Sequence, residues 1–221
     1  MKSYFRNMVT ISLVFILLSG CNGITGQTQS TATFSTASKG TPTPFITAEA
    51  FFDGTRVTYV GNSGFLITVG DKKVLIDALF SGISGVYKLP VNAQGLLVHA
   101  SPPFDDIDLI FATHNHPDHF SASMVQTHMQ NNPKAVFIST SQVTNQIKGF
   151  NDRVITLGAS AGNPVQKVIN RFQVEAIYLS HGNGATGETE VMNQGYVINI
   201  DGVTVFHTGD IDASFLSPEN L

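Results

Sequence analysis

The sequence predicts an α/β (α+β) domain built from layered sheets and helices. Residues 56–79 hold β-branched and aromatic runs separated by glycine-containing turns. Residues 107–112 form an apolar run of the kind seen in a buried strand, and later strand-like runs are interleaved with short helix-like segments. Strands that alternate with short helices favour a sheet covered by helices.

The folded region opens with a predicted antiparallel meander. The stretch "RVTYVGNSGFLITVGDKKVLIDAL" (56–79) contains three strands, separated by residues 61–64 and by the hairpin signal at residues 70–71. The run "IDLIFA" (107–112) predicts a strand that is buried on both faces. Ser121 or Ser123 then caps a predicted helix that runs to about Gln130 and ends before Asn132-Pro133.

The second half of the chain is expected to be richer in strands than in helices. A short helix is predicted within "SQVTNQIKGF" (141–150), and Asp201-Gly202 predicts a hairpin between the last two strands. The strands are expected at "AVFIST" (135–140), "RVITL" (153–157), "QVEAIYLSH" (173–181), "YVINI" (196–200) and "VTVFHTGD" (203–210).

The first fifty residues predict export and attachment to a membrane. Lys2 and Arg6 precede an apolar run over residues 8–18, which is typical of a secretory signal (1–20) and too short to span a bilayer. The sequence "LSGC" resembles the bacterial lipobox, which implies lipidation of Cys21, the one cysteine of the chain. The alternative is an ordinary signal peptide with a cysteine nearby. Residues 21–50 are rich in Thr and Ser and predict a flexible tether, so the domain is placed at 51–221.

The amino-acid composition and net charge indicate a globular domain and argue against one class of binding partner, nucleic acid. Hydrophobic residues make up 42% of the chain and charged residues 13%, which indicates a well-buried globular domain. The net charge of −4 provides no general basic surface, and nucleic-acid binding depends on neutralising phosphates with Lys and Arg. We therefore expect no nucleic-acid partner.

A histidine cluster, "THNHPDHF" (113–120), follows the buried strand. His114 and His116 lie two apart in an extended segment, so their imidazoles project to the same side and can bind one metal ion. Asp118 and His119 diverge from that pair after Pro117 and can serve a second ion. Imidazole nitrogen and carboxylate oxygen are preferred ligands of Zn²⁺ and similar divalent ions. The alternative is an exposed polar loop with a chance run of histidines.

The pattern His-x-His-x-Asp-His after an apolar strand resembles the signature of the metallo-β-lactamase fold superfamily. Asp77 in "VLIDAL", His181 in "YLSHG" and Asp210 in "VFHTGD" extend the resemblance in the family's order. It implies a four-layer αββα sandwich of two similar halves with two divalent ions. One ion is then held by His114, His116 and His181, and the other by Asp118, His119 and a bridging Asp210. Asp77 is expected to hold the loop through hydrogen bonds, and His207 is expected to be structural.

The resemblance implies a hydrolase that acts on a small molecule. A hydroxide bridging the two ions would attack an ester, lactone or phosphoester bond, with Asp118 orienting it and carrying its proton. Zinc is the first choice of metal, with manganese or iron as alternatives. The second interpretation is a non-catalytic metal- or ligand-binding lipoprotein of the same fold.

Three features depart from these patterns or compete with them. The segment "GNSGF" (61–65) resembles one in a lactonase-like subgroup that usually has histidine where this chain has Asn62. The family has one further histidine on a later strand, whereas here none follows His207. We therefore expect a fragment with an incomplete second half, or else a degenerate member with one competent metal site. Residues 158–162 match G-x-S-x-G, but Asn163-Pro164 interrupts the helix that a serine nucleophile elbow needs.

Overall fold

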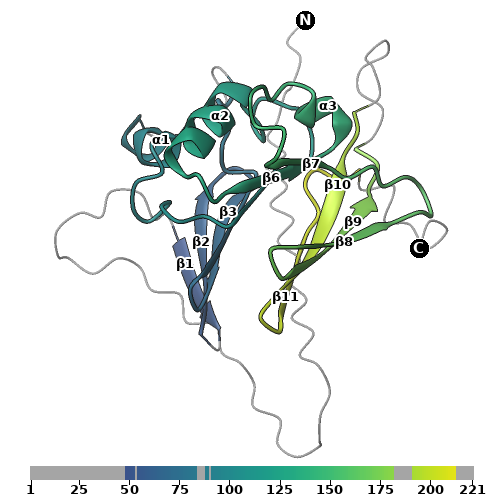
Figure 1. Cartoon of the computed structure of the whole chain (residues 1–221), viewed down its shortest axis with the longest axis horizontal. Helices are drawn as coiled ribbons and strands as arrows, with labels where there is room; N and C mark the ends of the chain where they lie inside the picture. Colours follow the sequence, from purple (N-terminus) through teal and green to yellow (C-terminus); the bar gives the residue numbers. More distant parts are fainter. Residues whose placement is uncertain (1–47, 53, 84–87, 90, 182–190, 213–221) are drawn as a thin grey trace, which may run out of the picture.

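The computed structural model describes residues 48–52, 54–83, 88–89, 91–181 and 191–212, which form two sheets and three helices. Three helices cover one face of a seven-stranded sheet, and a four-stranded sheet packs on its other face (Figure 1). The predicted α/β class is confirmed. The described residues supply helix, sheet and sheet, which are three of the four layers that the resemblance implies.

The larger sheet combines the predicted meander with a parallel half. Its strand order follows the sequence from β1 to β7, antiparallel from β1 to β4 and parallel from β4 to β7. The strands are β1 (Ala48–Phe52), β2 (Thr55–Gly61), β3 (Gly64–Val69), β4 (Lys72–Ile76), β5 (Leu109–Phe111), β6 (Val136–Ser139) and β7 (Val154–Thr156). Strand β1 begins inside the segment predicted as a tether, because it joins the edge of β2 through backbone pairing, which composition does not register.

The smaller sheet is antiparallel throughout, in the order β11-β10-β9-β8. Its strands are β8 (Val165–Ile169), β9 (Phe172–Tyr178), β10 (Gln194–Ile200) and β11 (Val203–His207). Asp201 and Gly202 connect β10 to β11 with φ values of 49° and 91°. Positive φ at both central residues is what a tight hairpin with the twist of its strands requires, so the Asp-Gly signal is confirmed.

The helices are α1 (Val91–Val98), α2 (Ala122–Asn131) and α3 (Ser141–Thr144). Helices α2 and α3 lie where the sequence predicts them. Helix α2 begins after Ser121, which is in the extended conformation of a capping residue. No helix among the described residues is long and apolar enough to cross a membrane. The predicted signal peptide, Cys21 and nearly all of the tether lie outside the described residues.

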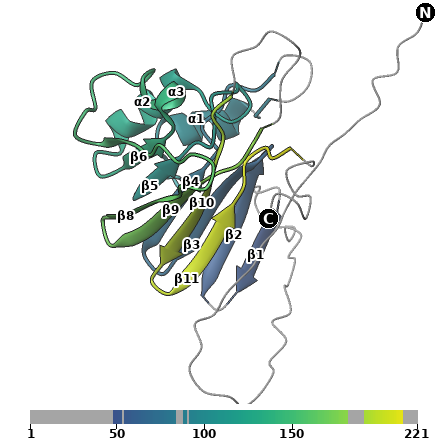
Figure 2. The same ribbon diagram turned by 90° about the vertical axis from the view of Figure 1, so that its right-hand side faces the viewer.

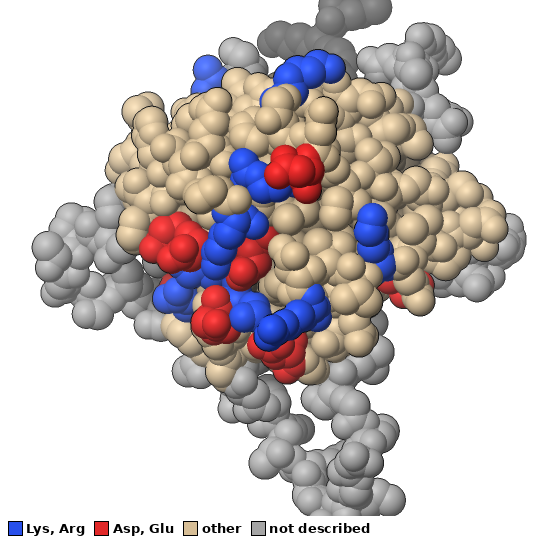
Figure 3. Space-filling view, viewed as in Figure 1, with Lys and Arg blue, Asp and Glu red and all other residues tan. Residues whose placement is uncertain are grey.

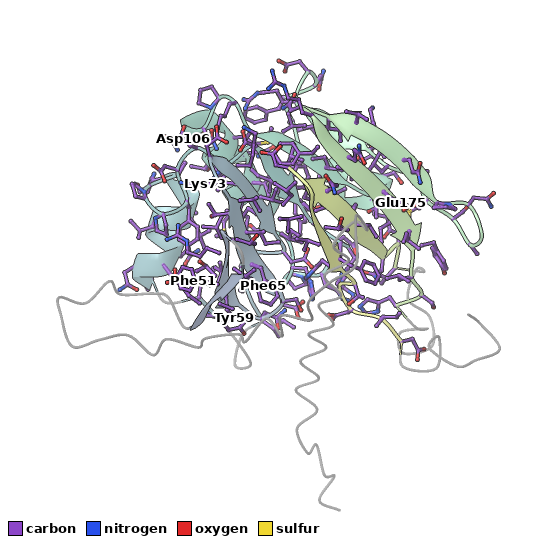
Figure 4. The ribbon with its side chains drawn as sticks, turned by 90° about the horizontal axis from the view of Figure 1, so that it is seen from below. Phe51, Tyr59, Phe65, Lys73, Asp106 and Glu175 are labelled. Carbon is purple, nitrogen blue, oxygen red and sulfur yellow. The ribbon has the colours of Figure 1, made fainter. Side chains whose placement is uncertain are left out.

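Two apolar cores explain why the central strands read as continuous apolar runs. Leu75, Ile110 and Phe137 contribute to the core against the helices, while Ile76 and Phe111 contribute to the core between the sheets. Alternate side chains of a strand point to opposite faces, so each central strand feeds both cores. The side chains of the two sheets meet in the space between them in Figure 4. Each such fully buried aliphatic or aromatic side chain stabilises the fold by about 1.5–3 kcal/mol.

The topology brings four chain segments to one edge of the sandwich. The parallel strands β4 and β5 end there, leading to Asp77 and to residues 113–120. The start of β10 pairs with the end of β9 through Gln194 and Tyr178, and with the end of β11 through Tyr196 and His207 (Figure 2). Strands β9 and β11 therefore leave their sheet side by side with the start of β10, toward residues 179–181 and 208–210.

Candidate metal centre

The first group of metal-ligating side chains combines both sheets. One ligand atom from each of His114, His116 and His181 lies within 4.8 Å of the others. The ring centroids of each pair are 4.7 Å apart. The Nε2 atoms of His114 and His181 are buried and have no hydrogen-bond partner. Buried polar atoms are normally paired, so converging orphan nitrogens fit a cation that they would share.

The second group shares His114 with the first and adds His119 and Asp210, again with ligand atoms within 4.8 Å. The His119 Nε2 atom lies 3.2 Å from Asp210 Oδ1. The His181 Nε2 atom lies 3.9 Å from the other oxygen, Asp210 Oδ2. The Asp210 carboxylate therefore faces both groups, as a bridging ligand must.

Asp118 belongs to neither group in the described part of the chain. Its Oδ2 atom lies 3.9 Å from His119 Nε2, at the side of the second group. The Asn62 side chain donates from Nδ2 to the backbone oxygen of Asp118 at 3.0 Å and is 3.4 Å from its carboxylate. The structure thus gathers five of the six predicted ligands and leaves the Asp118 carboxylate beside them.

Asp77 is fully buried and accepts four hydrogen bonds beneath the centre. Its Oδ1 accepts from the backbone N–H of Thr113 at 2.8 Å, and its Oδ2 accepts from the Thr113 hydroxyl at 2.8 Å. The Oδ2 atom also accepts from His119 Nδ1 at 2.9 Å and from His207 Nε2 at 3.0 Å. The bond to Nδ1 leaves Nε2 of His119 facing Asp210, where it can bind an ion.

The electrostatics of the centre reflect burial opposed by close opposite charges. Burial lowers the pKa of His114 to about 3, aided by the positive charge of His119. Burial also acts against the charge of His119, but Asp77 and Asp210 outweigh it and raise the pKa of His119 to about 10. The Asp77 pKa lies far below its usual range despite burial, because His119 and His207 face this carboxylate.

The donor set of the centre suits a divalent cation. Imidazole nitrogen and carboxylate oxygen bind Zn²⁺, Mn²⁺ and Fe²⁺, and two of the nitrogens here have no other partner. The residues present therefore fit the metal ions that the sequence implies. His114, His116 and His181 can hold one ion, and His119 and Asp210 can hold the second together with His114.

Two further histidines, His128 and His99, belong to neither ligand group in the described part of the chain. His128 is buried under α1, 2.6 Å from the backbone oxygen of Leu97, and His99 is exposed. Ser160 is exposed in a turn that leads into strand β8, so the helix that a nucleophile elbow needs does not follow it. The sequence did not assign the contact of Asn62 with Asp118. The resemblance of "GNSGF" to a subgroup with histidine at this position pointed to Asn62 but not to its partner. The structure places Asn62 in the turn with φ of 48°.

Comparison with known families decides what kind of domain carries this centre. The sequence model of the beta-lactamase superfamily domain matches residues 56–220. The chain belongs to the beta-lactamase superfamily. The match spans all the candidate ligands.

Relatives of this superfamily member share its sequence at a moderate level. The UPF0173 metal-dependent hydrolase of Pyrococcus furiosus is 29% identical over 157 residues, covering 70% of this chain and 61% of the relative. A protein of the same name from Roseiflexus is 28% identical over 168 residues, covering 71% and 62%. The chain thus spans about three fifths of the length of the curated relatives it matches.

A solved structure supports the fold of this superfamily member. A crystal structure from Parabacteroides distasonis, designated a candidate metal-dependent hydrolase, aligns with a TM-score of 0.50 at 14% identity. The alignment covers 83% of this chain and 67% of that chain. At this identity the likeness establishes the shared fold.

Proposed function

We propose that this protein is a metal-dependent hydrolase with two divalent cations, zinc being the first choice and manganese or iron the alternatives. The observation that carries the proposal is the pair of ligand groups that share His114, with the Asp210 carboxylate facing both. Relatives named metal-dependent hydrolases support the same reaction class.

Different residues of the chain would have different roles in hydrolysis. Bound cations would supply Lewis-acid activation of water and of the substrate's electrophilic centre. Asp118 stands outside both ligand groups and so remains able to orient the attacking water and accept its proton. Asn62 fixes Asp118 in this place by donating to its backbone oxygen at 3.0 Å. Asp77 keeps His119 and the 113–119 loop in position from beneath.

The proposed substrate is a small molecule with an ester, lactone or phosphoester bond. Each of these bonds presents an electrophilic carbon or phosphorus to an activated water. The superfamily scaffold fixes the metal ligands, while surrounding loops determine which bond fits, so the fold alone does not select among the three.

The first experiment measures metal content and hydrolysis on the purified full chain. We expect two equivalents of metal by elemental analysis, and turnover on a panel of lactone, phosphodiester and β-lactam compounds. This turnover should be lost with EDTA and restored by Zn²⁺. Activity that survives exhaustive chelation contradicts the proposal, and two bound ions without turnover on any compound favour the non-catalytic binding protein.

A matched pair of variants tests the role of Asp118. Asp118→Asn should keep both ions and lower the rate by about 10²–10⁴-fold, the usual contribution of a positioned acid or base. Asp106→Asn, on an exposed loop away from the centre, should leave both metal content and rate unchanged. A fully active Asp118→Asn variant would remove Asp118 from the mechanism.

We also propose that the chain is exported and held at a bacterial membrane through a lipid on Cys21. The signal-like run at residues 8–18 and the sequence "LSGC" support this. Labelling of expressing cells with a palmitate analogue should mark the wild-type chain and leave Cys21→Ser unmarked and released from the membrane fraction. An unlabelled, released wild-type chain would contradict the anchor.

A further inference from the structure

The two candidate ligands on the smaller sheet, His181 and Asp210, follow strands that do not pair with each other. Strands β9 and β11 both pair with β10, which lies between them. A side chain placed just before β10 therefore lies between the ends of both strands. The residue at this position is Asn193, which is fully buried.

Asn193 holds both strand ends. Its Nδ2 donates to the backbone oxygen of Leu179 at 3.1 Å and to that of Thr208 at 3.3 Å. Each of these carbonyls lies two residues before a candidate ligand, His181 in one case and Asp210 in the other. The amide has two N–H bonds, so one side chain can satisfy both carbonyls.

The neighbouring backbone ties the same segment to the larger sheet. The N–H of Gln194 donates to the oxygen of Thr113 at 3.1 Å, directly before His114. A Cβ added at Gly209 would lie 2.5 Å from the Thr113 hydroxyl and 2.7 Å from Asn193 Oδ1. Asn193, Thr113 and Gly209 are thus packed against one another without room for a further carbon.

We propose that Asn193 is a positioning residue that fixes the distance between His181 and Asp210 and so the geometry of both metal sites. This inference rests on the proposed function, because it concerns the same two ions. Asn193 touches neither ion; it acts through the two carbonyls that it holds. Residues that orient metal ligands in this way typically account for about 10- to 100-fold in metal affinity or activity.

Cobalt loading tests the proposal, because Co²⁺ occupies N/O sites and its visible absorption reports ligand geometry. Asn193→Ala removes the NH₂ group that donates to both carbonyls, and Asn193→Asp keeps the shape but places one carboxylate oxygen against both of them. We expect both variants to lose about 10- to 100-fold in Co²⁺ affinity in at least one site, with an altered visible spectrum of the bound ion. The added negative charge of the Asp variant would by itself tighten cation binding, so weakening in both variants identifies geometry as the cause.

Asn199→Asp is the matched control. Asn199 lies on the same strand, β10, and its side chain donates to the Thr204 hydroxyl at 3.1 Å near the hairpin. Its cobalt spectrum and affinity should equal those of the wild type. Unchanged affinity and spectrum in folded Asn193→Ala would overturn the inference. A wild-type chain that binds no Co²⁺ would overturn the proposed function instead.

The wild-type chain allows a measurement that needs no variant to fold. The side-chain amide NMR signals of Asn193 should shift when Zn²⁺ is added to the metal-free protein, because both of its acceptors lie two residues from a ligand. Those of Asn199 should stay in place. Asn193 signals that do not move at saturating Zn²⁺ would contradict the proposal.

Discussion

Replacing the buried aspartate beneath the centre by its uncharged isostere should cost a large part of the stability of the fold. Asp77 accepts four hydrogen bonds, three of them at Oδ2 and one at Oδ1. In Asp77→Asn one of these positions becomes an NH₂ group. Even in the better orientation, with the amide oxygen accepting three bonds, the NH₂ group faces the backbone N–H of Thr113.

The magnitude follows from what this substitution leaves unpaired. A hydrogen bond to a charged group contributes about 1.5–3 kcal/mol, and a buried donor without a partner costs about 1–3 kcal/mol. The histidines also lose the negative charge of a fully buried carboxylate that faces them. We expect the free energy of unfolding to fall by about 3–5 kcal/mol, the usual cost of breaking a buried charged pair. Total stabilities of about 5–15 kcal/mol make this loss easy to measure.

Urea unfolding of the metal-free chain at neutral pH, in EDTA, measures this loss without a contribution from bound ions. Asp106→Asn is the control, because Asp106 is exposed and its φ of 52° is one that asparagine also tolerates. The unfolding midpoint of the control should match that of the wild type. A loss below about 1 kcal/mol in Asp77→Asn, less than one such bond contributes, would refute the view of Asp77 as a charged acceptor of four bonds.

Three further perturbations have defined outcomes. Zn²⁺ at 100 times its dissociation constant should stabilise the wild-type chain by about 2.7 kcal/mol in thermal unfolding, and His114→Ala should lose most of this gain. Gly209 and Gly202 both have positive φ, so alanine is strained at either position, but only at Gly209 does the added carbon also clash with Thr113. Gly209→Ala should therefore destabilise the fold by about 1–3 kcal/mol more than Gly202→Ala in the same unfolding assay. Burial lowers the pKa of His128, so its contribution to stability is complete above the unfolded value of about 6.5 and is lost as the pH falls through the window below it. His128→Gln should therefore flatten the dependence of unfolding free energy on pH in that window by up to about 1.4 kcal/mol per pH unit, and an unchanged slope would contradict this.

The fold could be predicted where local pattern and tertiary environment agree. The meander at 56–79 has the predicted turns, and helix α2 begins directly after Ser121, although the Ser121 side chain makes no capping hydrogen bond. Helix α1 carried no such signal, because "VNAQGLLV" has a glycine inside and no polar face with helical spacing. Strand β8, "VQKVI", is exposed over most of its length at a sheet edge. Its sequence therefore lacks a clear alternation of buried and exposed residues that would predict a strand.

The site could be predicted only as far as its residues lie close together in sequence or follow a known order. Residues 113–120 can be identified as candidate metal ligands from their composition, because histidines and an aspartate lie close together there. The hydrogen bond from His207 to Asp77 joins residues 130 positions apart, and the bond from Asn62 to Asp118 joins residues 56 positions apart, so neither follows from a local pattern. The carbonyls that Asn193 holds could not be identified either, because they depend on the order β11-β10-β9 and not on any pattern in the chain.

The centre straddles the seam between the two sheets, with three of its histidines on one side and His181 and Asp210 on the other. A cation bound there would act as a removable cross-link between the two halves of the sandwich. Stripping it should loosen the smaller sheet as a unit, and amide hydrogen exchange should then accelerate in β9–β11 more than in β3–β5. The same ion would thereby have both a catalytic role and a structural role.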